Sequence, residues 1–353
     1  MNTNEVSPDM LILARESRGL TQSALAREAD VSQGNISKYE SGVLKVSPEH
    51  LARIAAVLNY PAAFFSLAER RYGFGSSCTY HRKRQTLPAY EERRLLAEMN
   101  KLRIQVARLL NGVEVEATNG FHPMELEDYN GSAANVAAAV RTSWNLPMGP
   151  IDNMIRAIEG AGGVVQRQPF GTRKMDAISQ WVPGLPPLFM TNVESSTDRL
   201  RYTLAHELGH IIMHRVPTGD TMEEEADQFA AEFLAPGREI GPDLTNLKWG
   251  DLGRLKAYWK ISMASLIRRA RDLHRITDRQ YRSLYTQLSK HGYRLEEPGP
   301  LPVEEPALLN EILDLHRTEY GYSVQEMSHL LVLNEAEYRE RFVPSKHGFR
   351  MVG

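Results

Sequence analysis

The residues whose types and spacing could do chemistry are His206, Glu207 and His210, which form the pattern H-E-x-x-H. On a helix the two histidines lie one turn apart, so both imidazoles point from the same face. Two imidazoles at this spacing can occupy two corners of a tetrahedral zinc site, and Glu207 then lies where it can deprotonate a bound water. The pattern therefore predicts a metal site that still needs a third protein ligand and an open fourth corner.

Three consecutive glutamates downstream, Glu223, Glu224 and Glu225, supply candidates for the third ligand. They open a second predicted amphipathic helix over residues 222–234, whose apolar stripe comprises Ala226, Phe229, Ala230, Phe233 and Leu234. Helical phase places Glu223 on the apolar face and turns Glu225 away from it. Glu223 is therefore the predicted third ligand, and Glu224 is the less favoured alternative.

Two further side chains are candidates to support the ligands. Asp227 lies one turn after Glu223 on the same side, where its carboxylate can accept a hydrogen bond from a ligating histidine. His214 continues the row of His206 and His210, but it lies about 12 Å along the helix axis from His206, too far for all three to bind one ion. We therefore expect His214 to be a supporting or surface residue.

A structural cluster without metal is the competing interpretation, because H-E-x-x-H also arises by chance. Here the pattern lies inside an otherwise apolar helix, and a matching acidic helix follows closely. Buried charges at such positions need partners, and a metal would supply one, which favours the metal site. Met213 stands where the metzincin extension of the pattern requires glycine, which excludes that family.

Two sequence motifs carry a family resemblance. Residues 199–210 read R-x-R-Y-T-L-A-H-E-L-G-H, and residues 223–236 read E-x-E-A-D-x-F-A-x-x-F-L-x-P. Together they resemble the ImmA/IrrE metallopeptidases, over roughly residues 152–295. Members of that family resemble compact zincins that cut repressor proteins in bacteria and their mobile elements.

By position, this resemblance implies a role for each matching residue. His206, His210 and Glu223 would be the ligands of one Zn²⁺ per chain, and Glu207 would be the general base. The resemblance also implies a protein substrate, with a repressor as the expected one.

Length and composition limit the classes of protein that the chain can be. Its 353 residues, 42% of them apolar, are enough for two or three domains with real cores. A formal net charge of −2 argues against a protein that coats nucleic acid generally. The single cysteine, Cys78, excludes an internal disulfide framework and fits a reducing compartment. No apolar run reaches the length of a signal peptide or a membrane span, so we expect a cytoplasmic location and no membrane partner.

The N-terminal residues 8–68 are predicted to form five short helices. Thr21 caps the second and Ser32 caps the third, and Asp30 lies in the turn between them, where a left-handed conformation is needed. Two short helices joined in this way form a helix-turn-helix. The pattern T-Q-x-x-L-A-x-x-x-x-V-S-x-x-x-I-S-x-x-E-x-G over residues 21–42 resembles the Cro/XRE repressor family, in which glycine usually stands at the position of Asp30.

If this resemblance holds, the third helix enters the major groove of a double-stranded DNA operator. Amide side chains suit adenine edges and lysine suits guanine, whereas Gln22 would hold a phosphate. The residues expected to contact DNA are Gln22, Gln33, Asn35, Ser37 and Lys38. Residues 1–70 carry 7 Lys and Arg against 8 Asp and Glu, which predicts weak binding by this part alone. A helical bundle that binds only protein is the alternative.

Residues 71–110 are the most basic part of the chain, with 9 Lys and Arg against 3 Asp and Glu. The basic cluster at residues 81–84 could add phosphate contacts beside the helix-turn-helix. A long helix predicted over residues 89–110 could dimerise the protein, because repressor-like readers span two half-sites, and a homodimer is therefore expected. A solvated linker and a spacer helix are the alternative.

The expected fold class is mainly α with a small β-sheet. Strands are predicted over residues 164–168, 177–182 and 188–192, just before the H-E-x-x-H helix, and helices resume after residue 236. A possible further helix-turn-helix near Ser323 gives only a weak signal. The expected parts are a five-helix Cro/XRE helix-turn-helix bundle (1–70), a basic linker with a long helix (71–118), a minimal zincin-like α+β domain (119–295) and a small helical C-terminal module (296–353).

Two functions follow from these patterns. The first is a DNA-binding transcriptional regulator carrying a zinc endopeptidase that cleaves a repressor or regulatory protein, the chain itself included. In that function Glu207 moves the proton, and Tyr202 or His214 is the candidate donor to the oxyanion. The second is a transcription factor without proteolysis, whose zincin fold senses a metal or ligand. An intact Glu207 favours the peptidase, because a pure sensor needs no general base.

Overall fold

The computed structural model describes residues 5–73, 79–80, 87–113, 120–214, 221–294 and 296–343. The described chain forms two compact units. Unit 1 lies within residues 1–73, 86–115 and 309–353, and unit 2 within residues 74–85 and 116–308. Helices dominate both, and a single small sheet is described, as the sequence predicts. None of the described helices combines the length and apolar character needed to cross a membrane.

Unit 1 begins with the predicted helical bundle. Its elements are α1 (Pro8–Ser17), α2 (Gln22–Glu28), α3 (Gln33–Glu40), α4 (Pro48–Leu58) and the 3-10 helix η1 (Ala62–Ser66), which stands in place of a fifth α-helix. The hydroxyl of Thr21 accepts a hydrogen bond from the Ala24 amide, and that of Ser32 accepts one from the Asn35 amide. Asp30 adopts the expected left-handed backbone conformation, with φ = 50°.

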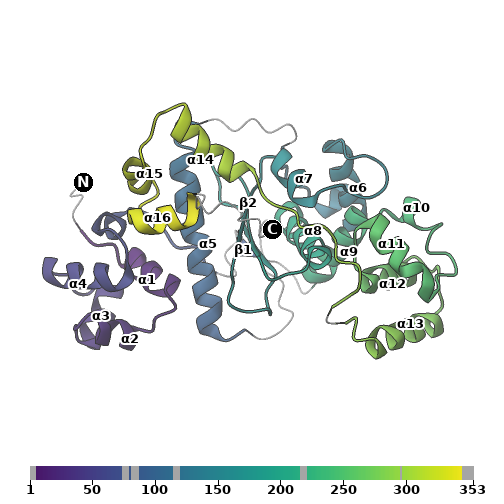
Figure 1. The fold of residues 1–353 in the computed structure, drawn as a ribbon, viewed down its shortest axis with the longest axis horizontal. Coiled ribbons are helices and arrows are strands. Elements are labelled where there is room, and N and C mark those ends of the chain that lie inside the picture. The colour runs from purple at the N-terminus through teal and green to yellow at the C-terminus, as the bar shows by residue number, and fades with distance from the viewer. Residues whose placement is uncertain are drawn as a thin grey trace, which may run out of the picture. The chain divides into compact units, whose positions relative to one another are not determined.

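The rest of unit 1 consists of the long helix α5 (Ala89–Leu109) and three C-terminal helices, α14 (Leu308–Thr318), α15 (Val324–Leu330) and α16 (Glu335–Phe342). Both α1 and α15 pack against α5 (Figure 1). Ile104 of α5 and Val332, between α15 and α16, are buried in the same core as α1–α4. The structure thus groups the chain differently from the expected four-part division, because these helices bury apolar side chains in the bundle.

The sheet belongs to unit 2 and has the strand order β1-β3-β4-β2. Strands β2 (Val164–Gln168) and β4 (Leu188–Asn192) run parallel, whereas β3 (Ala177–Gln180) runs antiparallel to β4. All residues of β3 and β4 are buried. The two-residue strand β1 (Thr79–Tyr80), which the sequence did not predict, pairs antiparallel with Ser179 and Gln180 of β3.

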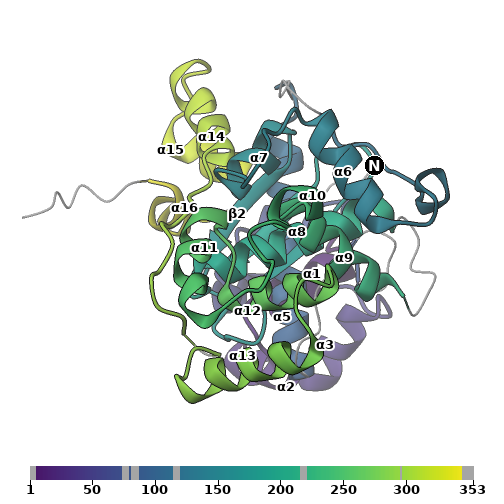
Figure 2. The same ribbon diagram turned by 90° about the vertical axis from the view of Figure 1, so that its right-hand side faces the viewer.

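The rest of unit 2 is helical. The two motif helices are α8 (Thr197–Met213) and α9 (Met222–Leu234), which lie side by side (Figure 2). Helix α8 also packs on β3. The remaining helical elements are η2 (Leu126–Tyr129), α6 (Ala133–Ser143), α7 (Met154–Gly160), α10 (Gly237–Ile240), η3 (Trp249–Asp251), α11 (Leu252–Trp259), α12 (Met263–Asp272) and α13 (Asp278–Lys290).

Candidate metal centre and DNA-reading helix

The candidate metal centre depends on a close approach of α8 to α9. Fifteen of the seventeen residues of α8 are buried, which fixes the helix between the sheet and its neighbours. Gly209 permits the approach, because a Cβ atom there would lie 3.1 Å from the Phe229 ring of α9. This contact brings the first turn of α9, with its three glutamates, beside the two histidines of α8.

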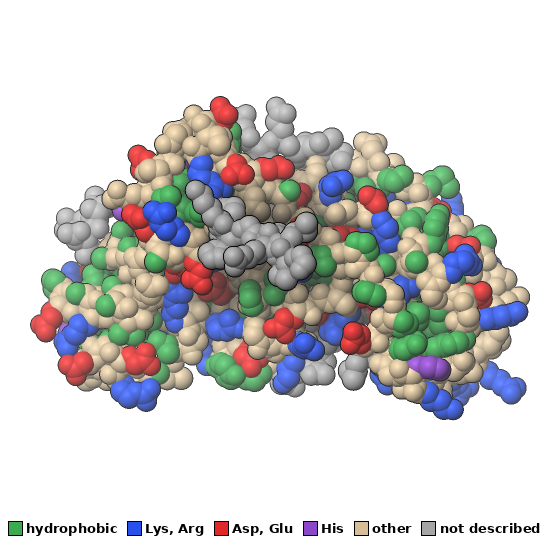
Figure 3. Space-filling view, in the orientation of Figure 1, with side chains coloured by type: hydrophobic (Ala, Val, Ile, Leu, Met, Phe, Trp, Pro, Cys, Tyr) green, Lys and Arg blue, Asp and Glu red, His purple; other side chains and the backbone are tan. Residues whose placement is uncertain are grey.

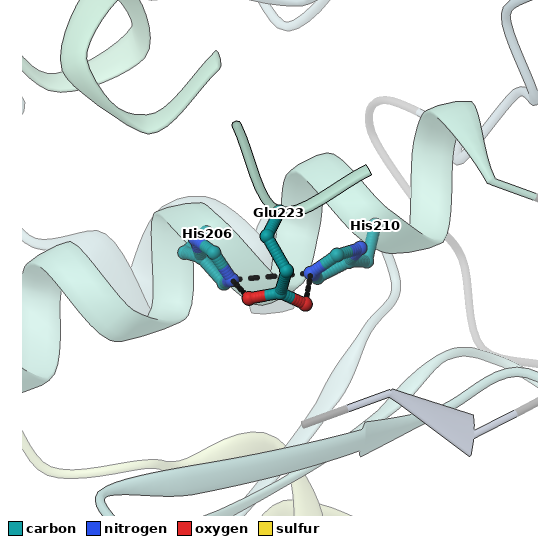
Figure 4. A group of neighbouring side chains, drawn as sticks. All are labelled: His206, His210 and Glu223. Atoms are coloured by element: carbon teal, nitrogen blue, oxygen red, sulfur yellow. Dashed lines mark hydrogen bonds and ion pairs between the residues drawn. The ribbon is translucent and has the colours of Figure 1, made fainter. Parts of the chain in front are cut away.

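His206, His210 and Glu223 converge on one point (Figure 4). The two Nε2 atoms of the histidines are 3.1 Å apart. The Glu223 carboxylate oxygens lie 3.5 Å from Nε2 of His206 and 3.3 Å from Nε2 of His210. Ligand atoms placed about 2.0–2.1 Å from one tetrahedral ion are about 3.3 Å from each other, so the spacing of these three side chains fits zinc. The Glu223 side chain is 60% exposed, which leaves the centre accessible from that side.

Hydrogen bonds behind the histidines assign the tautomer of each ring. Nδ1 of His206 lies 2.9 Å from the Asp227 carboxylate, which can only accept, so Nδ1 carries the proton. Nε2 of His214 similarly donates to the Glu225 carboxylate at 2.9 Å, leaving Nδ1 of His214 to accept from Nδ1–H of His210 at 2.9 Å. With Nδ1 engaged in this way, both His206 and His210 have Nε2 left for the centre, the atom through which each could bind a metal.

The charge states also suit a cation. Burial lowers the pKa of His210, and it lowers the pKa of His214 to about 4, with the nearby His210 adding to the effect. The contacts of Glu223 with His206 and His210 hold the pKa of its carboxyl well below its usual value of 4.5. Neutral imidazoles and an ionised carboxylate are the protonation states that zinc binding requires.

Glu207 is fully buried on α8, between the two candidate ligands in sequence. Its Oε2 accepts a hydrogen bond of 2.7 Å from the hydroxyl of Ser179 on β3. Ser179 is itself fully buried, so its hydroxyl fixes the orientation of the carboxylate. Sequence reasoning missed Ser179, since its contact with Glu207 depends on the packing of β3 against α8.

The two candidate oxyanion donors, Tyr202 and His214, both form hydrogen bonds with other groups in the structure. Both ring nitrogens of His214 are engaged, with His210 and Glu225, so His214 is a supporting residue and has no N–H left to donate. The Tyr202 hydroxyl donates to the backbone carbonyl of Asp227 at 3.4 Å. Helical phase predicts that Glu225 points away from the apolar face of α9. In the structure its carboxylate accepts a hydrogen bond from His214, at the end of α8.

A cavity of about 980 Å³ lies between α9, α12 and α13, next to the metal centre. Its lining includes Tyr202, Glu224 and Asp227 but none of the three converging residues. Glu224, the alternative ligand, faces this cavity and not the two histidines. Asp227 is shared, because the same side chain lines the cavity and hydrogen-bonds His206.

The predicted DNA-contacting residues lie on or beside α3. Gln33 and Lys38 are exposed, Asn35 and Ser37 are half-buried, and Ile36 packs fully into the core. One outer face of α3 is thus polar and accessible, as reading base edges requires.

Gln22 joins this surface to the interior of the bundle. Its amide nitrogen donates to Glu40 at 2.8 Å, and its amide oxygen accepts from Gln33 at 3.2 Å. Glu40 in turn forms a buried ion pair with Arg15 of α1, which holds α3 in place. Figure 3 shows acidic and basic side chains interspersed over this bundle, consistent with its balanced charge. The basic cluster at residues 81–84 lies outside the described residues.

Comparison with known families agrees with the two predicted domains. Residues 11–65 match a family model described as helix-turn-helix, and residues 158–271 match that of a peptidase family described as an IrrE N-terminal-like domain. No curated protein and no solved structure matched the chain. The second match contains both motif helices and Ser179. The chain therefore combines an N-terminal helix-turn-helix domain of the Cro/XRE type with a later domain of the IrrE/ImmA-like peptidase family.

Proposed function

We propose that this chain is a DNA-binding transcriptional regulator whose IrrE-like domain is a zinc-dependent endopeptidase. One observation carries the proposal: Nε2 of His206, Nε2 of His210 and the Glu223 carboxylate converge within 3.1–3.5 Å, with Glu207 adjacent on the same helix. A site that only stabilised the fold would not need two lone pairs and a carboxylate directed at one point.

The residues around this point divide the work of peptide hydrolysis. His206, His210 and Glu223 would hold a zinc ion, which would supply the Lewis acidity that makes water nucleophilic near neutral pH. Glu207 takes the proton of the attacking water and passes it to the leaving amine. Ser179 keeps the Glu207 carboxylate oriented through its 2.7 Å hydrogen bond.

The substrate that suits this arrangement is a DNA-bound regulatory protein. A DNA reader and a peptidase in one chain bring the cutting site close to proteins on the same DNA, so a repressor is the expected substrate. The chain itself is included, since it is also a DNA-binding protein.

The side of β3 that β1 now covers is the expected docking site for an extended substrate segment, by strand addition. The contact between Ser179 of β3 and Glu207 supports this choice, because Glu207 is the proposed general base. The chain's own strand β1 pairs with β3 at Ser179 and Gln180. A substrate strand adding to this edge must therefore displace β1.

The metal centre is tested first, by measuring the metal content and zinc affinity of the purified wild type beside Glu223→Ala and Glu225→Ala. One zinc per chain that is lost with Glu223→Ala, and only weakened with Glu225→Ala, is the expected result. Absence of metal from every version, even after zinc is supplied, would contradict the proposal of a zinc-dependent peptidase.

Proteolysis is tested separately, with zinc-loaded wild type and Glu207→Gln. Each is incubated alone and co-expressed with candidate repressors, and fragments are identified by mass spectrometry. Cleavage by the wild type only is expected. Equal survival of every partner, and of the chain itself, with both proteins would contradict the endopeptidase even if zinc is bound.

A ligand sensor without proteolysis is the second candidate function, and the cavity beside Asp227 favours it. A small molecule in that cavity could alter the Asp227–His206 hydrogen bond and so the metal centre. Equal promoter regulation by wild type and Glu207→Gln would support the sensor, whereas loss of regulation with Glu207→Gln would support the peptidase.

A further inference from the structure

The three C-terminal helices repeat the geometry of the N-terminal helix-turn-helix. Helices α2 and α15 both have seven residues, α3 and α16 both have eight, and a four-residue turn separates the helices of each pair. The second residue of each turn is left-handed: Asp30 has φ = 50° and Val332 has φ = 54°. Val332 is β-branched and disfavours this conformation strongly, so the surrounding packing must impose the turn.

The backbone hydrogen bonds of the two turns also correspond. The amide of Val31 donates to the Ala26 carbonyl at 2.9 Å, and the amide of Leu333 donates to the Ser328 carbonyl at 2.9 Å. Each first helix is capped by a hydroxyl, from Thr21 or Ser323, that accepts from the amide three residues later.

The similarity extends to the preceding helices. α1 and α14 each end shortly before a left-handed glycine, Gly19 with φ = 67° and Gly321 with φ = 69°. A constant offset along the chain thus relates helix, glycine turn, capped helix, left-handed turn and final helix. This correspondence identifies α14–α16 as a second helix-turn-helix module.

The outer face of α16 lacks the chemistry of a DNA reader. The exposed residues Gln33, Gly34 and Lys38 of α3 correspond to Glu335, Ala336 and Glu340 of α16, all exposed. Two carboxylates therefore occupy positions that would meet base edges and phosphates, where negative charge is repelled. Arg339, which corresponds to Ser37, is the single basic residue among the exposed residues of α16, and it contacts Glu335.

The two helices also differ at a position of α16 that faces the interior of unit 1. Asn35 of α3 corresponds to Glu337, whose side chain is 9% exposed and forms an ion pair of 2.6 Å with Arg18, the C-cap residue of α1. The Lys101 amine of α5 lies 3.7 Å from the same carboxylate. Burial alone would raise the pKa of Glu337, but the hydrogen bond from Arg18 and the charge of Lys101 lower it, so the carboxylate is ionised.

Hydrogen bonds from side chains to main-chain carbonyls join α14–α16 to α5. Arg108 donates to the Leu330 carbonyl at 2.5 Å and Gln105 to the Leu331 carbonyl at 3.4 Å. His316 of α14 donates from Nε2 to the Leu109 carbonyl at 2.8 Å. Contacts from α14 and from the turn after α15 thus reach the last two turns of α5.

We infer that α14–α16 are a second helix-turn-helix module that does not read DNA and instead binds α1 and α5 of its own chain. The segment that follows the IrrE-like domain in sequence thereby completes the DNA-binding unit. This inference does not depend on the peptidase activity proposed above.

The reading role is tested on full-length protein, with a duplex recovered from a random-sequence DNA library by the wild type, or with mixed-sequence duplex at low salt if none is enriched. Lys38→Ala is compared with Arg339→Ala, which removes the single basic side chain among the exposed residues of α16. Lys38→Ala should weaken binding about tenfold or more, and Arg339→Ala should stay within about twofold. An equal loss with Arg339→Ala would show that α16 reads DNA and overturn this part.

The docking role is tested by hydrogen exchange on Glu337→Gln, with Glu335→Gln on the exposed face of α16 as the matched control. Amides of α1 and α5 should exchange about tenfold faster in Glu337→Gln, while those of α8 stay unchanged. If Glu337→Gln proves too unstable to purify, Arg108→Ala, which removes the hydrogen bond from α5 to the Leu330 carbonyl, replaces it. Identical exchange in the Glu335 and Glu337 variants, or in Arg108→Ala and the wild type, would overturn the docking role.

Discussion

At the scale of single residues, the proposed metal centre depends on side chains that would not themselves bind the ion. Asp227 and His214 each contact Nδ1 of a candidate ligand, His206 or His210, which leaves Nε2 of that ring for the centre. Partners of this kind orient the ring and raise its basicity. Helical phase could predict Asp227 because it shares a face with Glu223, but the bond between His214 and Glu225 joins two helices and has no signal in either one.

Asp227→Asn should therefore weaken zinc binding by about 10–100-fold while leaving all three ligands in place. The amide still accepts the hydrogen bond from His206 but no longer carries the charge that makes the imidazole more basic. Competition with a chromophoric chelator measures the change. Glu224→Gln, on the same turn of α9 and away from both histidines, is the control, and an equal loss with it would contradict the assigned role of Asp227.

At the scale of elements, the spacing of α8 and α9 depends on Gly209. Alanine normally stabilises a helix interior by about 1 kcal/mol relative to glycine. At position 209 its Cβ would lie 3.1 Å from the Phe229 ring, so the ring or α9 must shift by a few tenths of an ångström. The candidate metal centre spans these helices, so a shift of α9 would also move Glu223 relative to the histidines.

Gly209→Ala should accordingly lower the free energy of unfolding, by about 1–3 kcal/mol, and weaken zinc binding. Gly253→Ala on α11 is the matched control, because its Cβ would meet only the end of Met263 at 4.0 Å. Urea unfolding and zinc titration of both variants check the prediction. A Gly209→Ala protein as stable as the wild type, with unchanged zinc affinity, would show that the close approach is unnecessary.

Most elements could be predicted from the sequence because their signals are local. The caps at Thr21 and Ser32, the left-handed turn at Asp30 and the apolar stripe of α9 each depend on a few neighbouring residues. Strand β1 has no such signal, since its two residues become a strand only by pairing with β3. The place of α14–α16 in unit 1 was likewise hidden, because Glu337 and Arg18 are far apart in sequence.

At the scale of the whole molecule, a buried ionic cluster links distant parts of the chain within unit 2. Lys256 of α11 donates to Asp198 of α8 at 2.7 Å and to Glu297 at 2.9 Å, and all three side chains are almost fully buried. Burial opposes both charges, but the hydrogen bond from Lys256 lowers the pKa of Asp198 and the bonds to both carboxylates raise the pKa of Lys256. The cluster thus stabilises the fold only while all its members are charged.

The sign of the resulting pH dependence follows from these shifts. The contribution of Asp198 is present above its usual pKa of 3.8 and is lost as pH falls through its lower folded value. That of Lys256 is present below its usual 10.5 and is lost as pH rises through its higher folded value. Stability from this cluster is therefore expected across the range between these two limits.

Lys256→Met should cost about 3 kcal/mol at neutral pH, because it leaves two buried carboxylates without their cation. This deficit should shrink below about pH 4, where the carboxylates can take up protons. Urea unfolding across pH measures it, with Lys260→Met as the control, since Lys260 pairs with the exposed Asp152 and should change stability little. A deficit that does not vary with pH would contradict the ionic origin.

The course of the chain through unit 1 has a consequence for self-cleavage. The chain passes from unit 1 into unit 2 after α5, forms the IrrE-like domain there, and re-enters unit 1 at α14. A backbone nick within residues 116–308 would break the covalent path, yet Arg108, His316 and Glu337 would still join the two fragments. The nicked protein would behave as a complemented pair: two bands on a denaturing gel, one species in native chromatography, and a DNA reader that has not been released.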